Sequence, residues 1–281
     1  MTSLIAWIGV DSRGPASFYL ASDSRISWGP GTHWDVGRKL FTSDKSPDLF
    51  GYCGDVLFPS LFLSQVSHLI DLRAGPNQVD KATFGPNQGA TPEMRHESLV
   101  SLAQTSFGRY PALQQRAFSI LHCSRQSSGM SSVFHLWRTD WSPGTAWHDE
   151  EIVLPTESVL VLSVESGAST VSLYDAEWRQ TGAGRTSRAV FSAFCDALRG
   201  GGDQFSGGAP QLVGLYRKGF GEACGVIYRG VRYPFGLPID RDKAVALPVE
   251  WRNELFERCD GRSMDRLQGT QRHCRPCHVS S

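Results

Sequence analysis

The order of strand-like and helix-like patterns limits the folds that are open to this chain of 281 residues. Apolar runs between turn residues predict strands at 3–10, 16–21, 39–43, 49–53, 117–122, 132–137, 158–164, 211–216 and 225–228. Apolar side chains at helical spacing predict helices over 59–72 and 185–199, and Thr91-Pro92 predicts the start of another. Because the strands come in groups rather than alternating singly with helices, we expect a layered α+β fold and not a series of βαβ units.

The overall composition excludes several classes of protein. Hydrophobic residues make up 40% of the chain and charged residues 20%, which is typical of a folded protein and not of a disordered one. The 28 basic and 28 acidic residues give a formal net charge of +0, so the chain lacks the positive field that drives non-specific binding to nucleic acid or to a membrane surface. We therefore expect neither nucleic acid nor a membrane among its partners.

The apolar runs also bear on localisation. The longest, such as 4–10 and 158–164, fall well short of the roughly 18–20 residues that span a bilayer. No basic region precedes the first run, so the start of the chain does not have the pattern of a signal peptide. The expectation is a cytoplasmic protein whose seven cysteines are reduced thiols or metal ligands.

Three segments interrupt the pattern of strands and helices. Segment 73–92 contains Gly-Pro-Asn-Gln twice, which predicts a surface insertion, with a binding loop as the alternative. Segment 138–155 also resembles an insertion. From about residue 245 the chain becomes Arg-rich and helix-like, and it ends in a tail of cysteines and histidines. We therefore divide the chain into a main domain, residues 1–244, and a C-terminal extension, residues 245–281.

The residue that follows the first methionine offers a chemical possibility. Because Thr2 is small, methionine aminopeptidase is expected to remove Met1 and to expose the α-amine of Thr2. A free N-terminal threonine combines a nucleophilic hydroxyl with an amine whose ordinary pKa of about 7.7–8.0 suits a general base. Since Met-Thr starts are common, this feature alone does not indicate an enzyme.

Several short motifs follow Thr2 along the chain. Ala21-Ser22-Asp23-Ser24-Arg25 ends the second predicted strand, and Lys39 begins the third. The next strand ends at Cys53-Gly54, and a late loop reads Asp203-Gln204-Phe205-Ser206-Gly207-Gly208. This ordered pattern resembles that of proteasome β-subunits and of the bacterial proteasome-like peptidases, which are N-terminal-nucleophile (Ntn) hydrolases. The resemblance implies a four-layer αββα sandwich for residues 1–244.

The resemblance also implies a role for each matching residue. The Thr2 hydroxyl would attack the substrate, and Lys39, held charged by Asp23, would lower the pKa of that hydroxyl. Asp203 and Ser206 would hold the α-amine of Thr2, which takes up the proton. The product would be an acyl-enzyme on Thr2 that water then hydrolyses.

Two positions depart from the family pattern. The oxyanion would face the backbone N–H of Gly54, which lies one residue off the usual spacing from the lysine. The family also has a Gly-Ser-Gly turn whose serine orients the amine. Counting back from Asp203 reaches Ser166-Gly167, whereas 181–184 reads Thr-Gly-Ala-Gly and would put Ala183 at the place of the serine. We favour Ser166; with Ala183 the amine would be held less firmly.

Each matching residue also has a simpler structural interpretation. Asp23 suits a turn with Arg25 as its surface partner, and Lys39 suits an exposed strand start. Asp203 and Ser206 suit a glycine-rich turn. The sequence contains no H-E-x-x-H, P-loop, G-x-S-x-G or complete G-x-G-x-x-G motif, so the metalloprotease, NTPase, serine esterase and dinucleotide-binding classes have no support.

The C-terminal tail gathers cysteines and histidines outside the family resemblance. Cys274 and Cys277 form a C-x-x-C pair, and Cys259 with His273 or His278 could complete four zinc ligands. The spacing is irregular and a second C-x-x-C is missing, so a tail of reduced thiols is the favoured interpretation.

Together these patterns predict a threonine-type amidohydrolase, most specifically a proteasome-like peptidase that acts on peptides or proteins without a cofactor. The resemblance implies a homo-oligomer, either a ring or a dimer, and leaves room for an ATP-driven partner. Two alternatives stay open. One is a non-catalytic proteasome-like scaffold or binding subunit that retains Met1, and the other is a zinc-tailed interaction protein whose function lies after residue 245.

Overall fold

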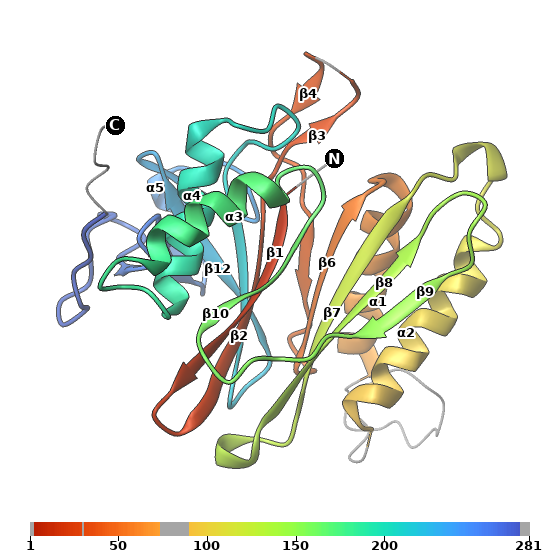
Figure 1. Ribbon diagram of the computed structural model, residues 1–281, viewed down its shortest axis with the longest axis horizontal. Helices are drawn as coiled ribbons and strands as arrows, with labels where there is room; N and C mark the ends of the chain where they lie inside the picture. Colours follow the sequence, from red (N-terminus) through yellow and green to blue (C-terminus); the bar gives the residue numbers. More distant parts are fainter. Residues whose placement is uncertain (1–2, 30, 74–89, 276–281) are drawn as a thin grey trace.

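Two β-sheets carry the fold in the computed structural model, which describes residues 3–29, 31–73 and 90–275 (Figure 1). The larger sheet has the order β10-β1-β2-β11-β12-β14-β15, with β13 paired to β12. Its strands are β1 (Leu4–Asp11), β2 (Gly14–Ser22), β10 (Val159–Val164), β11 (Gln211–Tyr216), β12 (Gly221–Tyr228), β13 (Val231–Pro234), β14 (Glu250–Asn253) and β15 (Arg258–Cys259). The smaller sheet, in the order β5-β6-β7-β8-β9, comprises β5 (Leu40–Thr42), β6 (Asp48–Gly54), β7 (Phe118–Gln126), β8 (Val133–Trp141) and β9 (His148–Glu151).

The described residues also form five α-helices and a short two-stranded ribbon. The helices are α1 (Leu57–Arg73), α2 (Pro92–Phe107), α3 (Ala168–Arg179), α4 (Ser187–Gly200) and α5 (Arg241–Ala246), with 3₁₀ turns at Ala112–Gln114 and Gly129–Ser131. The ribbon pairs β3 (Ile26–Ser27) with β4 (His33–Trp34) and projects beyond both sheets (Figure 1). The predicted α+β class is confirmed.

The side chains of β1 explain how the larger sheet is covered on both faces. Successive side chains of a strand point to opposite faces of the sheet. Accordingly, Leu4 and Ile8 join an apolar cluster shared with the smaller sheet, whereas Ile5 and Trp7 join a cluster shared with α4. Every residue from Leu4 to Ile8 is buried, so β1 lies at the centre of the core.

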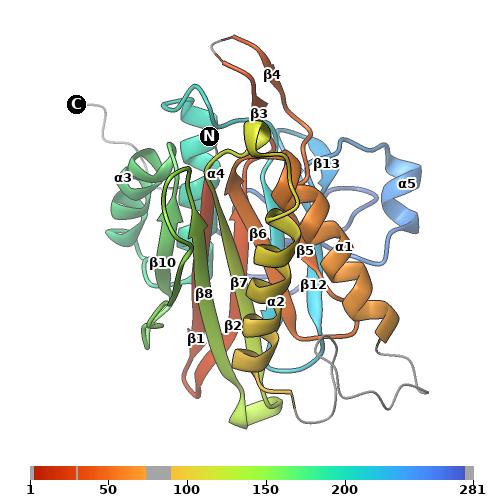
Figure 2. The same ribbon diagram turned by 90° about the vertical axis from the view of Figure 1, so that its right-hand side faces the viewer.

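The smaller sheet shows the same division between its two faces. Leu49 and Cys53 of β6 face the larger sheet, and Phe50 and Tyr52 face the helices α1 and α2. Figure 2 shows α1 and α2 side by side over this sheet. The order of packing is therefore α3 and α4, the larger sheet, the smaller sheet, and finally α1 and α2.

The start of α2 agrees with its sequence signature. The Thr91 hydroxyl accepts a hydrogen bond from the backbone N–H of Met94 at 3.3 Å, and Pro92 occupies the first turn. Proline is tolerated there because its missing N–H would have no partner within the helix. The predicted helix start is confirmed.

Several elements differ from the sequence prediction. Helix α3 was not predicted, although Val171, Tyr174 and Trp178 recur at helical spacing and pack into apolar clusters. The stretch expected to be helix-like after residue 245 forms strands β14 and β15. There Trp251 packs so closely on Gly225 that a Cβ atom at Gly225 would lie 2.4 Å from its ring.

The structure tests only one of the two predicted insertions, and it does not test the predicted domain boundary. Segment 138–155 is part of the smaller sheet, because it supplies the end of β8 and all of β9. Residues 74–89 of the other segment lie outside the described residues. The division at residue 245 stays a prediction. No helix in the described ranges is long and apolar enough to cross a membrane.

Candidate active site

A buried ion pair joins the ends of two strands at one edge of the sheets. Asp23 follows β2, and Lys39 directly precedes β5. The Lys39 Nζ atom donates to Oδ1 of Asp23 at 2.7 Å, and both side chains are buried. Burial lowers the pKa of Lys39, and the Asp23 carboxylate acts against that change.

The Asp23 carboxylate is held by three backbone N–H groups in addition to Lys39. Ser3 N–H donates to Oδ1 at 3.0 Å, whereas Arg25 N–H and Gly207 N–H donate to Oδ2 at 3.1 and 3.0 Å. These bonds come from the start of β1, from the chain just after Asp23 and from the 203–208 loop. Asp23 therefore fixes the first strand against that late loop.

A second network meets the first at Ser3. The Ser3 and Ser206 hydroxyl oxygens lie 2.7 Å apart, and Ser206 donates to Oδ2 of Asp203 at 2.6 Å. Since the single hydroxyl proton of Ser206 is directed to Asp203, Ser3 is the donor to Ser206. Ser166 also donates to Oδ2 of Asp203 at 2.6 Å.

The electrostatics of Asp203 follow from these contacts. Burial acts to raise the pKa of its carboxyl group. The hydrogen bonds from Ser166 and Ser206 and from the Phe205 N–H outweigh burial and lower the pKa. Asp203 is thus an ionised acceptor that orders two hydroxyl groups near the start of β1.

The two candidate positions for the orienting serine lie in different surroundings. Ser166 follows β10 and contacts Asp203, whereas Ala183 packs against Trp178 in a small apolar cluster. Gly167 permits the approach of Ser166 to the first strand, because a Cβ atom there would lie 1.6 Å from the Ser3 Oγ atom. The described structure therefore brings Ser166, and not Ala183, to the network.

Gly54 ends β6 with a backbone that favours glycine. Its φ is +88°, and a Cβ atom would lie 2.5 Å from the carbonyl oxygen of Ala117. Gly54 lines an apolar pocket of about 730 Å³, to which the ribbon contributes Trp28 and Trp34. No hydrogen bond within the described residues links Gly54 to Asp203 or Ser206, so these groups form separate parts of the site.

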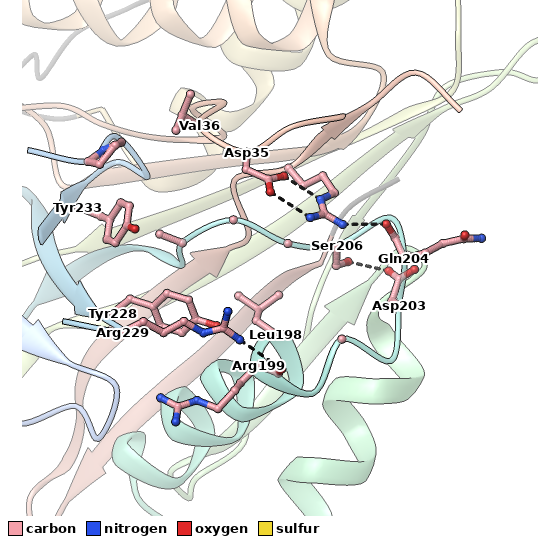
Figure 3. A pocket seen from close by; sticks show the side chains of 16 residues that line it. Asp35, Val36, Leu198, Arg199, Asp203, Gln204, Ser206, Tyr228, Arg229 and Tyr233 are labelled. Carbon is pink, nitrogen blue, oxygen red and sulfur yellow. Dashed lines mark hydrogen bonds and ion pairs between the residues drawn. The ribbon is translucent and has the colours of Figure 1, made fainter. Parts of the chain in front are cut away.

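The ion pair between Arg25 and Asp35 holds the 203–208 loop in place. The Arg25 guanidinium donates to both Asp35 oxygens, at 2.7 and 3.0 Å, and to the carbonyl oxygen of Gln204 at 3.0 Å (Figure 3). This bidentate pairing raises the pKa of Arg25 and lowers that of Asp35. It borders a second cavity of about 480 Å³ on the side of the loop where Arg229 lies.

The remaining predicted residues are placed as follows. Thr2 lies outside the described residues, as do Cys277 and His278. Cys259 is buried, burial raises the pKa of its thiol to about 11, and Cys274 is exposed. Within 3–29, 31–73 and 90–275 there is no group of three or more metal-ligating side chains.

Sequence reasoning missed Ser3. Its side chain is 2% exposed and connects Asp23 to Ser206 through its own N–H and hydroxyl. The available signal was its position at the buried start of β1, next to Thr2. The contact itself depends on a residue 203 positions away along the chain.

A likeness to known proteins comes from solved structures and not from sequences. No family model matches the chain, and no curated protein sequence does. Among solved structures, the fold is similar to that of eukaryotic HslV from Trypanosoma brucei, with a TM-score of 0.44 and 13% sequence identity. The match covers 76% of this chain and 99% of that one. The assignment of a function therefore rests on the residues of the site.

Proposed function

We propose that this chain is a threonine-type N-terminal-nucleophile amidohydrolase, a peptidase of proteasome-like type, and that its packing order is the four-layer αββα sandwich of such enzymes. The observation that carries the proposal is the convergence of two hydrogen-bond networks on Ser3. Asp23 and Lys39 form one network, and Asp203, Ser206 and Ser166 form the other. Both networks therefore meet at Ser3, the residue that follows Thr2 in the sequence.

The proposed first step uses groups of the chain alone. After removal of Met1, the Thr2 hydroxyl oxygen attacks the carbonyl carbon of an amide, and its proton passes to the Thr2 α-amine. The positive charge of Lys39, compensated by Asp23, stabilises the developing alkoxide. A neighbouring cation that favours the charged form lowers the pKa of a hydroxyl.

The amide bond then breaks with the proton balance preserved. The Thr2 ammonium returns its proton to the leaving amine, and an ester forms between the acyl group and the Thr2 oxygen. Water, activated by the free α-amine, hydrolyses this ester and releases the acid. Asp203, Ser206 and Ser166 orient the amine in both halves of the reaction.

Backbone at Gly54 completes the proposed site. Its N–H would donate to the oxyanion of the tetrahedral intermediate, an interaction whose loss typically costs about 10²–10³ in rate. The adjoining apolar pocket would take a side chain of the substrate next to the scissile bond. The predicted homo-oligomer and ATP-driven partner belong to the same proposal.

Hydrolysis by matched variants tests the proposal. Wild-type protein should cleave members of a panel of fluorogenic peptide amides. Thr2→Ser should cleave them more slowly, because serine keeps both the hydroxyl group and the α-amine. Thr2→Ala should lose cleavage entirely. Equal cleavage by wild-type protein and Thr2→Ala would show that another nucleophile acts. Absence of cleavage in all three would favour the non-catalytic scaffold.

A further inference from the structure

The backbone before Ser166 holds a charged residue in an unusual conformation. Glu165 has a φ of +70°, in the left-handed region that favours glycine over residues with a Cβ atom. It follows β10 and begins the turn that the Ala168 N–H closes onto the Glu165 carbonyl at 3.1 Å. The turn also contains Gly167, which is pressed against Ser3. Glu165 is thus fixed beside the candidate active site.

Two pockets meet at Glu165. One is the apolar pocket of about 730 Å³ beside Gly54, and the other has a volume of about 410 Å³. Glu165 and Ala117 are the residues that line both. Within the described residues, no hydrogen bond or ion pair engages the Glu165 carboxylate, which is exposed. Its charge is therefore available to a ligand in either pocket.

The apolar pocket has the features that recognise an organic cation. Trp28 and Trp34 of the ribbon line it and are 67% and 51% exposed, and the tryptophan ring is the side chain that attracts cations best. Asp55 adds a second carboxylate to the lining. Ile26 and Leu57 supply apolar surface for an aliphatic stem.

The guanidinium groups of the two pockets have acceptors within the described residues, and Asp55 accepts a hydrogen bond from the Phe58 N–H at 3.3 Å. Arg116 donates to the carbonyl oxygens of Leu113 and Gln115 at 3.1 and 2.9 Å. In the smaller pocket, Arg138 pairs with Asp140 at 2.9 Å. Carboxylates outnumber guanidinium groups in the apolar pocket by two to one, so its charge complements a positively charged side chain.

From this arrangement we propose that Glu165 determines specificity by selecting substrates with a lysine or arginine side chain next to the scissile bond. The inference rests on the proposed function and extends it. The aliphatic stem of the substrate residue would lie over Trp28 and Trp34, and its charged end would meet Glu165. Glycine at position 165 would adopt the positive φ without strain, but it would remove the carboxylate.

Peptide binding tests this inference without relying on turnover. Two peptides are compared on Thr2→Ala protein, one with lysine and one with norleucine, which has the same stem but no charge. The lysine peptide should bind about tenfold more tightly. Adding Glu165→Gln should reduce that ratio to about one, and Glu165→Gly should do the same although glycine suits the backbone. Glu157→Gln removes an exposed carboxylate outside both pockets and should leave the ratio unchanged.

Equal binding of the two peptides to Thr2→Ala protein, or an unchanged ratio in both Glu165 variants, would overturn the inference. Absence of binding by either peptide would overturn it as well. Hydrolysis by wild-type protein separates this result from the proposed function. Protein that cleaves both peptides with equal kcat/KM contradicts the role of Glu165 alone, whereas protein that binds lysine selectively and cleaves nothing contradicts the hydrolase.

Discussion

The Nζ atom of Lys39 lies 2.7 Å from Oδ1 of Asp23, and the two side chains are buried. Deleting one partner of a buried ion pair typically costs about 3–5 kcal/mol, because the other charge stays buried without compensation. Three backbone N–H groups also donate to Asp23, so the loss of its charge would disturb the start of β1 and the 203–208 loop together.

The first prediction concerns this ion pair. Lys39→Met should lower the free energy of unfolding by about 3–5 kcal/mol and abolish hydrolysis. The double variant Asp23→Asn/Lys39→Met should lose clearly less than the sum of the two single losses, because no uncompensated charge remains. Urea denaturation measures all three. Additive losses would mean that the two groups do not stabilise each other.

A second prediction concerns the shared acceptor Asp203. Ser166 and Ser206 both donate to its Oδ2 atom, so we expect Ser166→Ala and Ser206→Ala each to lower kcat/KM by about tenfold or more, through poorer orientation of the general base. The double variant should lose less than the product of the two effects. Ser172→Ala, which removes a hydroxyl bonded only to the Ala168 carbonyl of α3, should keep full activity.

A third prediction separates the two constraints on Gly54. Gly54→Ala should destabilise the protein by more than about 1 kcal/mol, because alanine disfavours a positive φ and its Cβ atom would meet the Ala117 carbonyl at 2.5 Å. Gly144 has a similar φ of +79° with open space around it, so Gly144→Ala measures the conformational cost alone. Equal changes in the free energy of unfolding would contradict the close contact.

A fourth prediction concerns acid stability. Burial lowers the pKa of His122 to about 4 despite its hydrogen bond with Asp48. Between the ordinary pKa of about 6.5 and this value, the unfolded chain binds a proton that the folded chain does not. The contribution of His122 should therefore make the protein about 2 kcal/mol less stable at pH 5 than at pH 7.

Two variants test whether His122 causes this dependence of the free energy of unfolding on pH. His122→Gln should flatten the dependence of the free energy of unfolding on pH between 7 and 5, whatever its overall stability. His68→Gln, at an exposed position of α1, should leave the slope as it is. Burial acts to raise the pKa of Asp48, but His122 and Arg95 hold it well below its ordinary value, so its stabilising effect is lost only below about pH 4. A slope that persists in His122→Gln would assign it to other groups.

Local sequence patterns correctly predicted the strands and helices in which the spacing of apolar residues matches the spacing of buried side chains. The alternation at the start of β1 and the apolar face of α4 are examples, since Ile5 and Phe191 lie in one cluster. Helix α3, which buries only Val171, Asp175 and Trp178, and strand β14, which is held by the packing of Trp251 on Gly225, were not predicted. These elements depend on neighbours that are distant in the chain.

The residues of the candidate site also differ in how far the sequence could predict them. The pairing of Asp23 with Lys39 was predicted from the resemblance in motif order, because 16 residues separate the two side chains in the sequence. Spacing alone left Ser166 and Ala183 as alternatives, and the contact with Asp203 distinguishes their surroundings. The only signal for Ser3 in the sequence was its position beside Thr2 at the start of the first strand, because its contact with Ser206 comes from a loop 203 residues away.

The most direct measurement is the intact mass of the protein before and after treatment with a peptidyl epoxyketone, a reagent that requires a free α-amine and a β-hydroxyl on one residue. The account predicts loss of Met1, a single covalent adduct on Thr2, and no adduct in Thr2→Ala. Retention of Met1 with no adduct, or an adduct of equal yield in Thr2→Ala, would contradict the central claim that Thr2 is the nucleophile.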